Sequence, residues 1–298
     1  MRSALWMVVG LCVGCASTPV RPAGRAPELT RPEGGLVVAL TSSAADPQPQ
    51  AEAFAAFVQE STGQPTRGVV FPDYDSLAVA LGEGKVDIAF LSPLAFVRAT
   101  DQGKVQAVLR AVRDGRDTYR SVLFARRGTG LDSLEALGRA RNLRAAWVDA
   151  SSATGYMFPK AMMVQRGLDP AGLFSSQDFL GSHDAVCQAV AGGKAEVGAT
   201  FLNDPASTEV QGCRAVLGEE VAGLVVIAAT EDIPNDVLAV REGFPPEAKG
   251  RLLIGATMLG SSEEGKRTLQ VAFLAEGFSQ IKRDDYEVVR RTVEVFRP

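Results

Sequence analysis

The residues with the clearest chemical potential are small hydroxyl side chains that stand between an apolar run and a helix-forming run. Residues 145–148 are typical of a buried strand and residues 160–165 of a helix, with Ser152 and Thr154 between them. Hydroxyl groups at such a junction cap the free amides of the first helical turn, and the remaining N–H groups and the helix dipole favour an anion. The stretch predicts either an ordinary helix cap or part of an anion site.

Further polar residues follow other predicted strands. Apolar runs predict strands that alternate with helices, at residues 36–40, 68–71, 86–91, 105–112, 119–125, 195–201 and 224–228. Such alternation across short loops predicts parallel βαβ units, in which ligands bind at the carboxyl ends of the strands. Candidate ligand-binding residues at such ends are Thr41–Ser43, Tyr74, Ser92 and the hydroxyl turn at Ser152, Ala153 and Thr154.

Two segments of the chain echo one another, which predicts two similar α/β lobes. Residues 82–90 and 192–201 each contain a glycine turn with a lysine and then a strand. We expect one lobe over residues 36–121 and 236–298 and the other over residues 122–235, with crossings near 120–124 and 233–238. Two crossing strands place the helix N-termini of both lobes around one cleft.

Composition narrows the class of protein. A chain of 298 residues suits two domains, and 46% hydrophobic with 22% charged residues is typical of a soluble globular protein. The net charge of −4 gives no general attraction for nucleic acid, and the single histidine, His183, argues against a multi-histidine metal site. We expect a monomer without a cofactor.

The N-terminus is typical of a bacterial lipoprotein signal peptide over residues 1–15. Arg2 precedes a short apolar run, too short to span a bilayer, and Gly14 stands directly before Cys15. We expect Cys15 to be lipidated, residues 16–34 to form a disordered tether, and the protein to be extracytoplasmic and held at the membrane by its lipid. A plain secretory peptide is the alternative.

Two further cysteines, Cys187 and Cys213, remain for the mature domain. An exported compartment permits a disulfide between them. Two free buried cysteines are equally compatible with the sequence.

Three motifs in this order resemble the phosphate-, phosphite- and phosphonate-binding proteins of ABC importers. They are Val86-Asp87-Ile88-Ala89, the turn at residues 149–159 and the segment 182–186, and the resemblance runs over about residues 36–250. It implies the type II periplasmic-binding-protein fold, an α/β architecture of two Rossmann-like lobes joined by two crossing strands. It also implies that the lobes close on a small oxyanion and deliver it to an ABC permease in the membrane.

The resemblance also assigns site residues. It places the family's hydroxyl turn on Ser152, Ala153 and Thr154, its histidine on His183 and a ligand-contacting tyrosine on Tyr74. The chain departs from the family at Ala153, where a hydroxyl is common. It also departs at Leu91, where some members have a tyrosine, which makes that wall of the site more apolar.

The residues have a chemical interpretation of their own. Hydroxyls, amides and a histidine N–H at converging helix ends can hold a tetrahedral oxyanion without neutralising its charge. Asp204 can accept the proton of a protonated ligand oxygen, or act as a helix cap before Pro205. Ser92 and Tyr119 are weaker candidates.

Two other functions are compatible with parts of the sequence. A hydrolase built on Ser152, His183 and Asp184 lacks a G-x-S-x-G elbow, and adjacent His and Asp residues do not easily form a relay, so we expect no enzyme. A sensor lipoprotein that presents an anion to a membrane receptor fits the sequence as well as a transport protein does.

Overall fold

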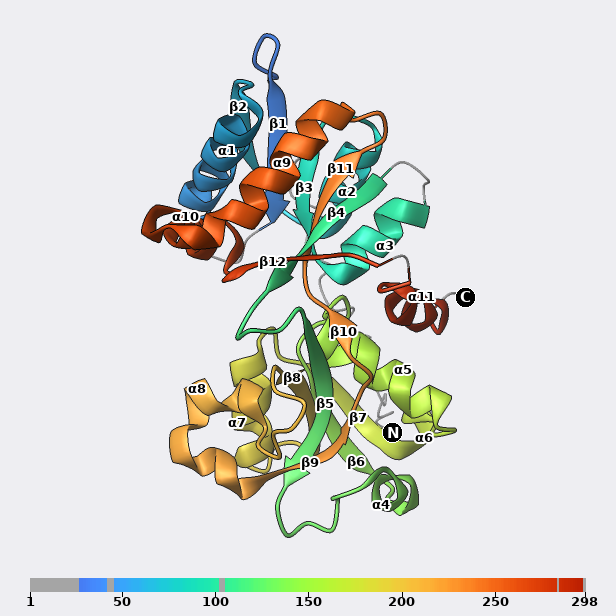
Figure 1. The fold of residues 1–298 in the computed structure, drawn as a ribbon. Coiled ribbons are helices and arrows are strands. Elements are labelled where there is room, and N and C mark those ends of the chain that lie inside the picture. Colours follow the sequence, from blue (N-terminus) through green and yellow to red (C-terminus); the bar gives the residue numbers. More distant parts are fainter. Residues whose placement is uncertain (1–26, 42–45, 102–104, 283, 297–298) are drawn as a thin grey trace, which may run out of the picture.

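Figure 1 shows the fold in a computed structural model, which describes residues 27–41, 46–101, 105–282 and 284–296. The predicted signal peptide, the predicted lipidation site Cys15 and residues 16–26 of the predicted tether lie outside the described residues, as do Ser42 and Ser43.

The first lobe is built on a mixed sheet with strand order β12-β4-β11-β3-β1-β2. Strands β1, β2 and β3 are parallel, whereas β11 runs antiparallel to β3 and β4, and β12 antiparallel to β4. Helices pack against both faces of this sheet, and buried apolar side chains fill the two interfaces. Its strands are β1 (Leu36–Thr41), β2 (Thr66–Phe71), β3 (Ile88–Leu91), β4 (Val105–Val112), β11 (Val237–Arg241) and β12 (Gly277–Gln280). Its longer helices are α1 (Gln48–Thr62), α2 (Tyr74–Gly82), α3 (Pro93–Asp101) and α9 (Pro246–Met258), followed by α10 (Glu263–Thr268).

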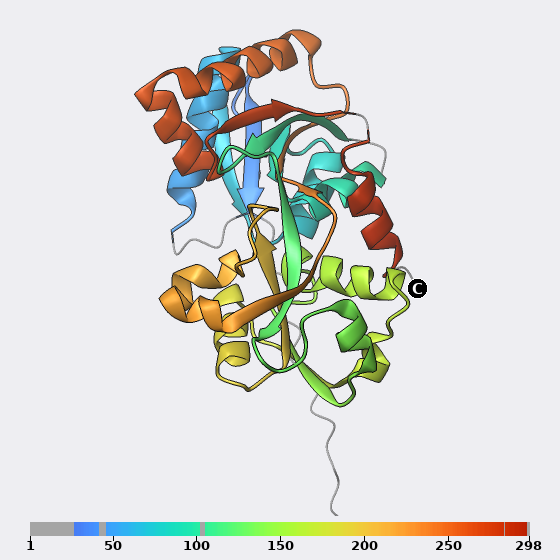
Figure 2. The same cartoon turned by 60° about the horizontal axis from the view of Figure 1, so that its bottom comes forward.

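The second lobe has a sheet of order β10-β5-β8-β6-β7, with β9 paired to β5. Strand β6 is parallel to β7 and β8, and β5 is antiparallel to β8, β9 and β10. The strands are β5 (Thr118–Arg126), β6 (Leu143–Trp147), β7 (Phe174–Phe179), β8 (Val197–Leu202), β9 (Leu224–Ala229) and β10 (Ile233–Pro234). The helices are α4 (Leu134–Arg139), α5 (Phe158–Gln165), α6 (Pro170–Leu173), α7 (His183–Ala191) and α8 (Arg214–Leu217). Figure 2 shows the blue arrow of β1 and the gold arrow of β8 each pointing toward the opposite lobe.

The chain crosses between the lobes twice. It leaves the first sheet at Val112 and enters the second at Thr118, and it returns between Pro234 and Val237. The second crossing lies inside the expected range of 233–238. The first does not, because residues 120–124 already belong to β5 and pair with β8. The Nδ2 atom of Asn235 joins the crossings by donating to the carbonyls of Ala111 (3.2 Å) and Arg116 (3.1 Å).

The C-terminal helix α11 (Glu287–Glu294) is a further link between the lobes. In Figures 1 and 2 it lies beside α3 and near the boundary of the two lobes. Its Arg291 forms an ion pair of 2.7 Å with Glu231 of the second lobe, and the hydroxyl of Tyr286 donates to the carbonyl of Asn235 at 3.1 Å. Tyr286 also stacks edge-on against Phe96 of α3, with ring centroids 4.8 Å apart.

The repeat seen in the sequence is a repeat of structure. Gly84 and Gly193 both adopt left-handed backbone angles, with φ of 72° and 71°. The amides of the following lysines, Lys85 and Lys194, donate back to the preceding helix at 3.0 and 2.8 Å. An acidic residue directly precedes each strand that follows, and its side chain accepts from a neighbouring strand.

The acidic residues of the repeat are Asp87 and Glu196. Asp87 Oδ2 accepts from the amide of Val37, and Glu196 Oε2 accepts from the amide of Arg144, both at 2.8 Å. The Asp87 side chain is fully buried, whereas that of Glu196 is 25% exposed. Two arginines pair with Asp87, one of which is Arg31. Each carboxylate therefore links two neighbouring strands, and it does so at the same position in the two lobes.

Three predicted elements are wrong. Residues 27–34, expected within a disordered tether, lie against the first lobe, because Leu29 packs on its core and Arg31 pairs with buried Asp87. The segment after Pro205 forms turns instead of a helix. From Pro245 onward the sequence predicts only helices, whereas β12 in that part of the chain is a strand and joins the sheet by pairing with β4 alone.

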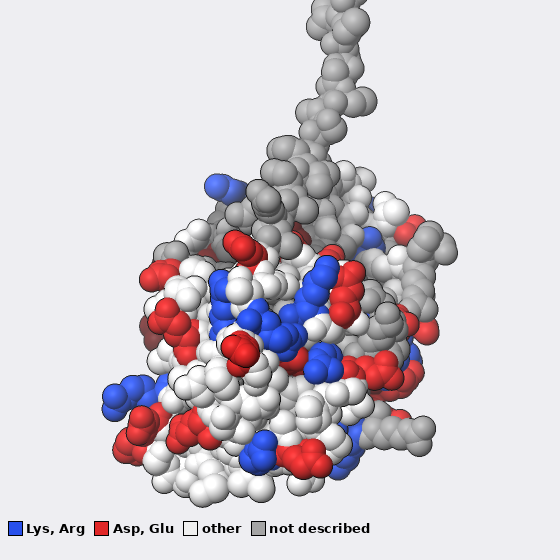
Figure 3. Space-filling model, turned by 90° about the horizontal axis from the view of Figure 1, so that it is seen from above, with Lys and Arg blue, Asp and Glu red and all other residues white. Residues whose placement is uncertain are grey.

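The outer end of the first lobe carries both signs of charge. Figure 3 views it from above and shows acidic side chains interspersed with basic ones, some of which gather near the middle. Within the part of the chain that the structure describes, no helix combines the length and apolar character needed to cross a bilayer.

Candidate functional site

The hydroxyl turn lies where β6 gives way to α5. Ser152 caps a single π-helical turn (Ala153–Met157) that continues into α5, and its Oγ accepts from the amide of Gly155 at 3.1 Å. A side chain at Gly155 would clash, because a Cβ there would come within 2.3 Å of Val148. Since Ser152 accepts in this bond, its own hydroxyl proton stays available. The turn is therefore a helix cap, as predicted, and the Ser152 hydroxyl is still available as a donor.

Thr154 is the most enclosed residue of this turn that carries a hydroxyl. It is 6% exposed, and its carbonyl accepts from Ser121 Oγ on β5 at 2.7 Å. Among the described residues its own Oγ1 has no hydrogen-bond partner. A ligand that reached this turn would find an unused hydroxyl held by a backbone anchored to the sheet.

Aromatic contacts hold the turn from behind. The ring of Tyr156 packs edge-on against Trp147 at 5.6 Å and meets Phe296, just beyond α11, at 6.0 Å. Lys160 Nζ donates to the Tyr156 hydroxyl at 2.5 Å. The C-terminal segment thus braces the turn that carries Thr154.

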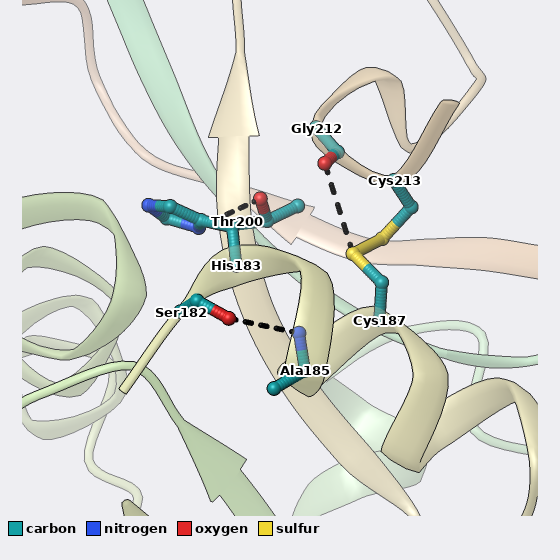
Figure 4. Close-up of a disulfide and its surroundings, with 7 residues drawn as sticks. All are labelled: Ser182, His183, Ala185, Cys187, Thr200, Gly212 and Cys213. Atoms are coloured by element: carbon teal, nitrogen blue, oxygen red, sulfur yellow. Dashed lines mark hydrogen bonds between the residues drawn. A yellow bond between two sulfur atoms is a disulfide. The ribbon is translucent and has the colours of Figure 1, made fainter. Parts of the chain in front are cut away.

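His183 is the first residue of α7, and Ser182 caps this helix through the amide of Ala185 at 3.2 Å. Its Nδ1 atom lies 2.9 Å from Thr200 Oγ1 (Figure 4). Its ring also meets that of Phe201 edge-on, with centroids 5.3 Å apart. Burial lowers the pKa of the imidazole and outweighs the nearby Asp184, which raises it. The ring is therefore neutral at neutral pH.

The cysteines of the second lobe are joined. A disulfide links Cys187 of α7 to Cys213, the last residue of a short 3-10 helix (Gln211–Cys213). Of the two possibilities that the sequence left open, the structure has the bonded one. The bond ties the helix that begins with His183 to the loop that follows β8.

Asp204 lies in that loop and has partners of its own. It caps no helix; its Oδ1 accepts from the amide of Ala206 at 3.1 Å and pairs with Arg116 of the first crossing at 3.1 Å. The alternative of a helix cap is therefore wrong. A ligand oxygen would have to compete with Arg116 for this carboxylate.

The first lobe contributes a hollow of about 300 Å³ at the carboxyl ends of β1 and β3. Two predicted residues, Tyr74 and Ser92, line it, and fully buried Leu91 forms part of its apolar wall. Both are placed by caps: Tyr74 begins α2 after Asp73, and Ser92 Oγ accepts from the amide of Ala95 at 3.3 Å. The other polar residues of its lining are Thr41, Gln50, Asp73, Arg113 and Asp236.

Two tyrosines lie near a half-buried ion pair, between Arg113 and Asp236, beside this hollow. Tyr74 is 43% exposed, yet its phenol has a raised pKa, first through desolvation and next through Asp236, while a hydrogen bond with Thr41 lowers it. Desolvation also raises the pKa of Tyr119, again with Asp236 as the next cause. Both phenols are therefore neutral donors at any physiological pH.

Sequence reasoning missed the role of Asp236 and Arg113. The Arg113 guanidinium pairs with Asp236 at 2.7 Å and donates to the carbonyls of Leu274 (2.8 Å) and Phe273 (3.1 Å). These partners come from the second crossing and the C-terminal part of the chain. No local pattern around Arg113 predicts them.

The structure gathers the predicted residues into two groups. In the second lobe, Ser121 bonds Thr154 and pairs across the sheet with Phe201, beside the Thr200 that holds His183. In the first lobe, Tyr74 and Ser92 share the hollow, whose lining comes from that lobe and the crossings. Both groups lie at carboxyl ends of parallel strands. Within the described ranges, no cluster of His, Cys, Asp and Glu suits a metal ion.

Comparison with known proteins gives consistent relatives. A family model described as "ABC transporter, phosphonate, periplasmic substrate-binding protein" matches residues 36–286. The chain is 26% identical to the phosphate-import protein PhnD of Mycolicibacterium smegmatis over 233 residues, which cover 75% of this chain and 68% of that protein.

Many solved structures share the fold. XAC2383 from Xanthomonas citri, bound to chloride, superimposes with a TM-score of 0.73 and 21% identity over 89% of this chain and 98% of that chain. PhnD1 from Prochlorococcus marinus, in complex with methylphosphonate, does so with a TM-score of 0.66 and 18% identity over 88% and 98%. At these identities the structures show the two-lobed fold and no more.

Proposed function

Because the chain belongs to the family of periplasmic substrate-binding proteins of phosphonate ABC transporters, we propose that it binds a phosphate-, phosphite- or phosphonate-type oxyanion between its lobes. The observation that carries this is the pair of donor groups at the facing strand ends. Ser152, Thr154 and His183 belong to one lobe, and Tyr74 and Ser92 to the other. The proposal is for binding and delivery, not for catalysis.

The charges near the crossings favour neutral recognition. Arg113, Arg116 and Arg120 are each paired with an aspartate, at 2.7, 3.1 and 2.5 Å. None of them offers an unpaired guanidinium fork of the kind that grips a carboxylate. Hydroxyl and N–H donors at helix N-termini remain, and these suit a tetrahedral oxyanion.

The proposal extends to location and partners. Family membership implies an extracytoplasmic protein, and a disulfide is at home in an oxidising compartment. We infer that Cys15 carries a lipid that holds the protein at the membrane, where a monomer delivers its ligand to an ABC permease. A membrane receptor in place of the permease would use the same site.

The function is tested by titration. Calorimetry of the mature chain with phosphate, phosphite, methylphosphonate and 2-aminoethylphosphonate is expected to show saturable binding of at least one. Binding to the folded state alone also raises the melting temperature, by an amount that grows with ligand concentration. Acetate and sulfate are the controls. Flat traces for the whole panel, on protein refolded to remove carried-over ligand, would contradict the assignment of cargo.

A single hydroxyl tests the turn. Thr154→Val is expected to weaken binding of the preferred anion by about 1–3 kcal/mol, because a desolvated oxygen loses a donor. The matched control is Ser151→Ala in the same turn, since Ser151 is exposed and its hydroxyl already bonds Asp149 at 2.7 Å. Equal affinities of Thr154→Val and wild type would show that the turn is only a cap.

A further inference from the structure

We propose that Thr200 is a positioning residue of the binding site: its buried hydroxyl donates to Nδ1 of His183 and so fixes the imidazole as the tautomer that carries its proton on Nε2. This N–H then donates to the oxyanion. The inference rests on the proposed function for the role of His183, whereas the hydrogen bond itself can be tested without a ligand.

The direction of the hydrogen bond follows from burial. Thr200 is 0% exposed, so its hydroxyl proton has no solvent to bond with. A buried hydroxyl left without a partner destabilises the fold, because it has lost its hydrogen bonds with water. The ring nitrogen of His183, 2.9 Å away, is the partner that the described part of the structure gives to this oxygen. The hydroxyl must therefore donate, and a nitrogen that accepts this bond carries no proton.

The hydroxyl cannot easily turn elsewhere. Thr200 lies on β8, where it pairs with Val122 of β5. Gly212 lies so close that a Cβ on it would come within 2.2 Å of Thr200 Oγ1, so only glycine leaves room for this rotamer. The neighbouring residue, Cys213, is bonded to Cys187, which follows His183 by one helical turn. The disulfide therefore ties Gly212, which packs over Thr200, to the helix that carries the imidazole ring (Figure 4).

The other ring nitrogen is free to meet a ligand. Figure 4 shows it turned away from Thr200, and Nε2 has no hydrogen-bond partner among the described residues. An Nε2–H group adds a donor without adding charge, like the hydroxyls of Thr154 and Tyr74. The opposite tautomer would present a lone pair and repel an anion.

The chain contains one histidine, which makes the tautomer directly observable. Long-range 1H–15N NMR spectra of ligand-free protein, prepared without a histidine tag at pH 7.5, contain signals from a single imidazole. We expect Nδ1 to show the shift of an unprotonated nitrogen and Nε2 that of a protonated one. A protonated Nδ1, whether in the opposite tautomer or in the imidazolium, would overturn the proposal.

A pair of variants tests the role in binding. Thr200→Val keeps the shape but loses the donor, so we expect mixed tautomer signals and an affinity about tenfold lower for the best ligand of the panel. Thr200→Ser keeps the donor and is expected to restore both. Wild-type signals and affinity in Thr200→Val would refute the inference; if that variant does not fold, the wild-type spectrum decides alone. An Nε2–H tautomer together with flat titrations would overturn the cargo and leave the Thr200 hydrogen bond intact.

Discussion

Replacement of Asp87 by asparagine is expected to lower the free energy of unfolding by about 3–5 kcal/mol, the usual effect of breaking a buried charge pair. The Asp87 side chain is fully buried, and its oxygens accept from the Val37 amide and from the guanidinium groups of Arg31 and Arg241. An asparagine would turn an NH₂ group toward donors and leave at least one of them unpaired. Urea unfolding followed by circular dichroism measures the change.

The repeat provides a matched control. Glu196 holds the same place in the second lobe, with the Arg144 amide in place of that of Val37, but its side chain is 25% exposed. Glu196→Gln is therefore expected to cost about 1 kcal/mol or less, because water compensates an exposed pair. Equal losses in the free energy of unfolding of the two variants would show that burial does not increase the contribution of Asp87 to stability.

Removal of the disulfide, as Cys187→Ala with Cys213→Ala, is expected to lower the free energy of unfolding by about 3.5 kcal/mol. The bond closes a loop with a sequence separation of 26, and losing it returns that freedom to the unfolded chain. Both cysteines are fully buried, so the alanines also leave a small space in the core. The same urea experiment measures the loss.

The reduced wild-type protein separates these two effects. It lacks the bond but keeps both sulfur atoms, so its unfolding midpoint should fall close to, and slightly above, that of the double variant. A double variant within about 1 kcal/mol of the oxidised wild type would contradict the chain-entropy account of this bond. In either form, the NMR signals of the His183 ring are expected to broaden, since Gly212, which packs over Thr200, is no longer tied to α7.

Much of the fold was within reach of the sequence because its signals are local. Short apolar runs predicted strands such as β1 and β8. Asp73, Ser92 and Ser182 are residue types that cap helices and stand where helices are predicted to begin, and each accepts an amide bond as a cap does. The family resemblance and the internal repeat gave the two-lobed architecture. The sequence did not predict β12 or most of β7, because these strands carry mixed or polar residues and are defined by pairing with a neighbour.

The candidate site divides in the same way. The sequence by itself determined which residues carry donors and that they stand at strand ends, through the hydroxyl turn, Tyr74 and the lone His183. Only the tertiary structure decided their partners: the Thr200 hydroxyl on His183, Arg116 on Asp204 and the bond between the cysteines. These partners lie 17 to 88 positions apart along the chain and meet because strands far apart in sequence become neighbours in a sheet. Local sequence patterns do not predict such contacts, because the contacts depend on the packing of the whole lobe.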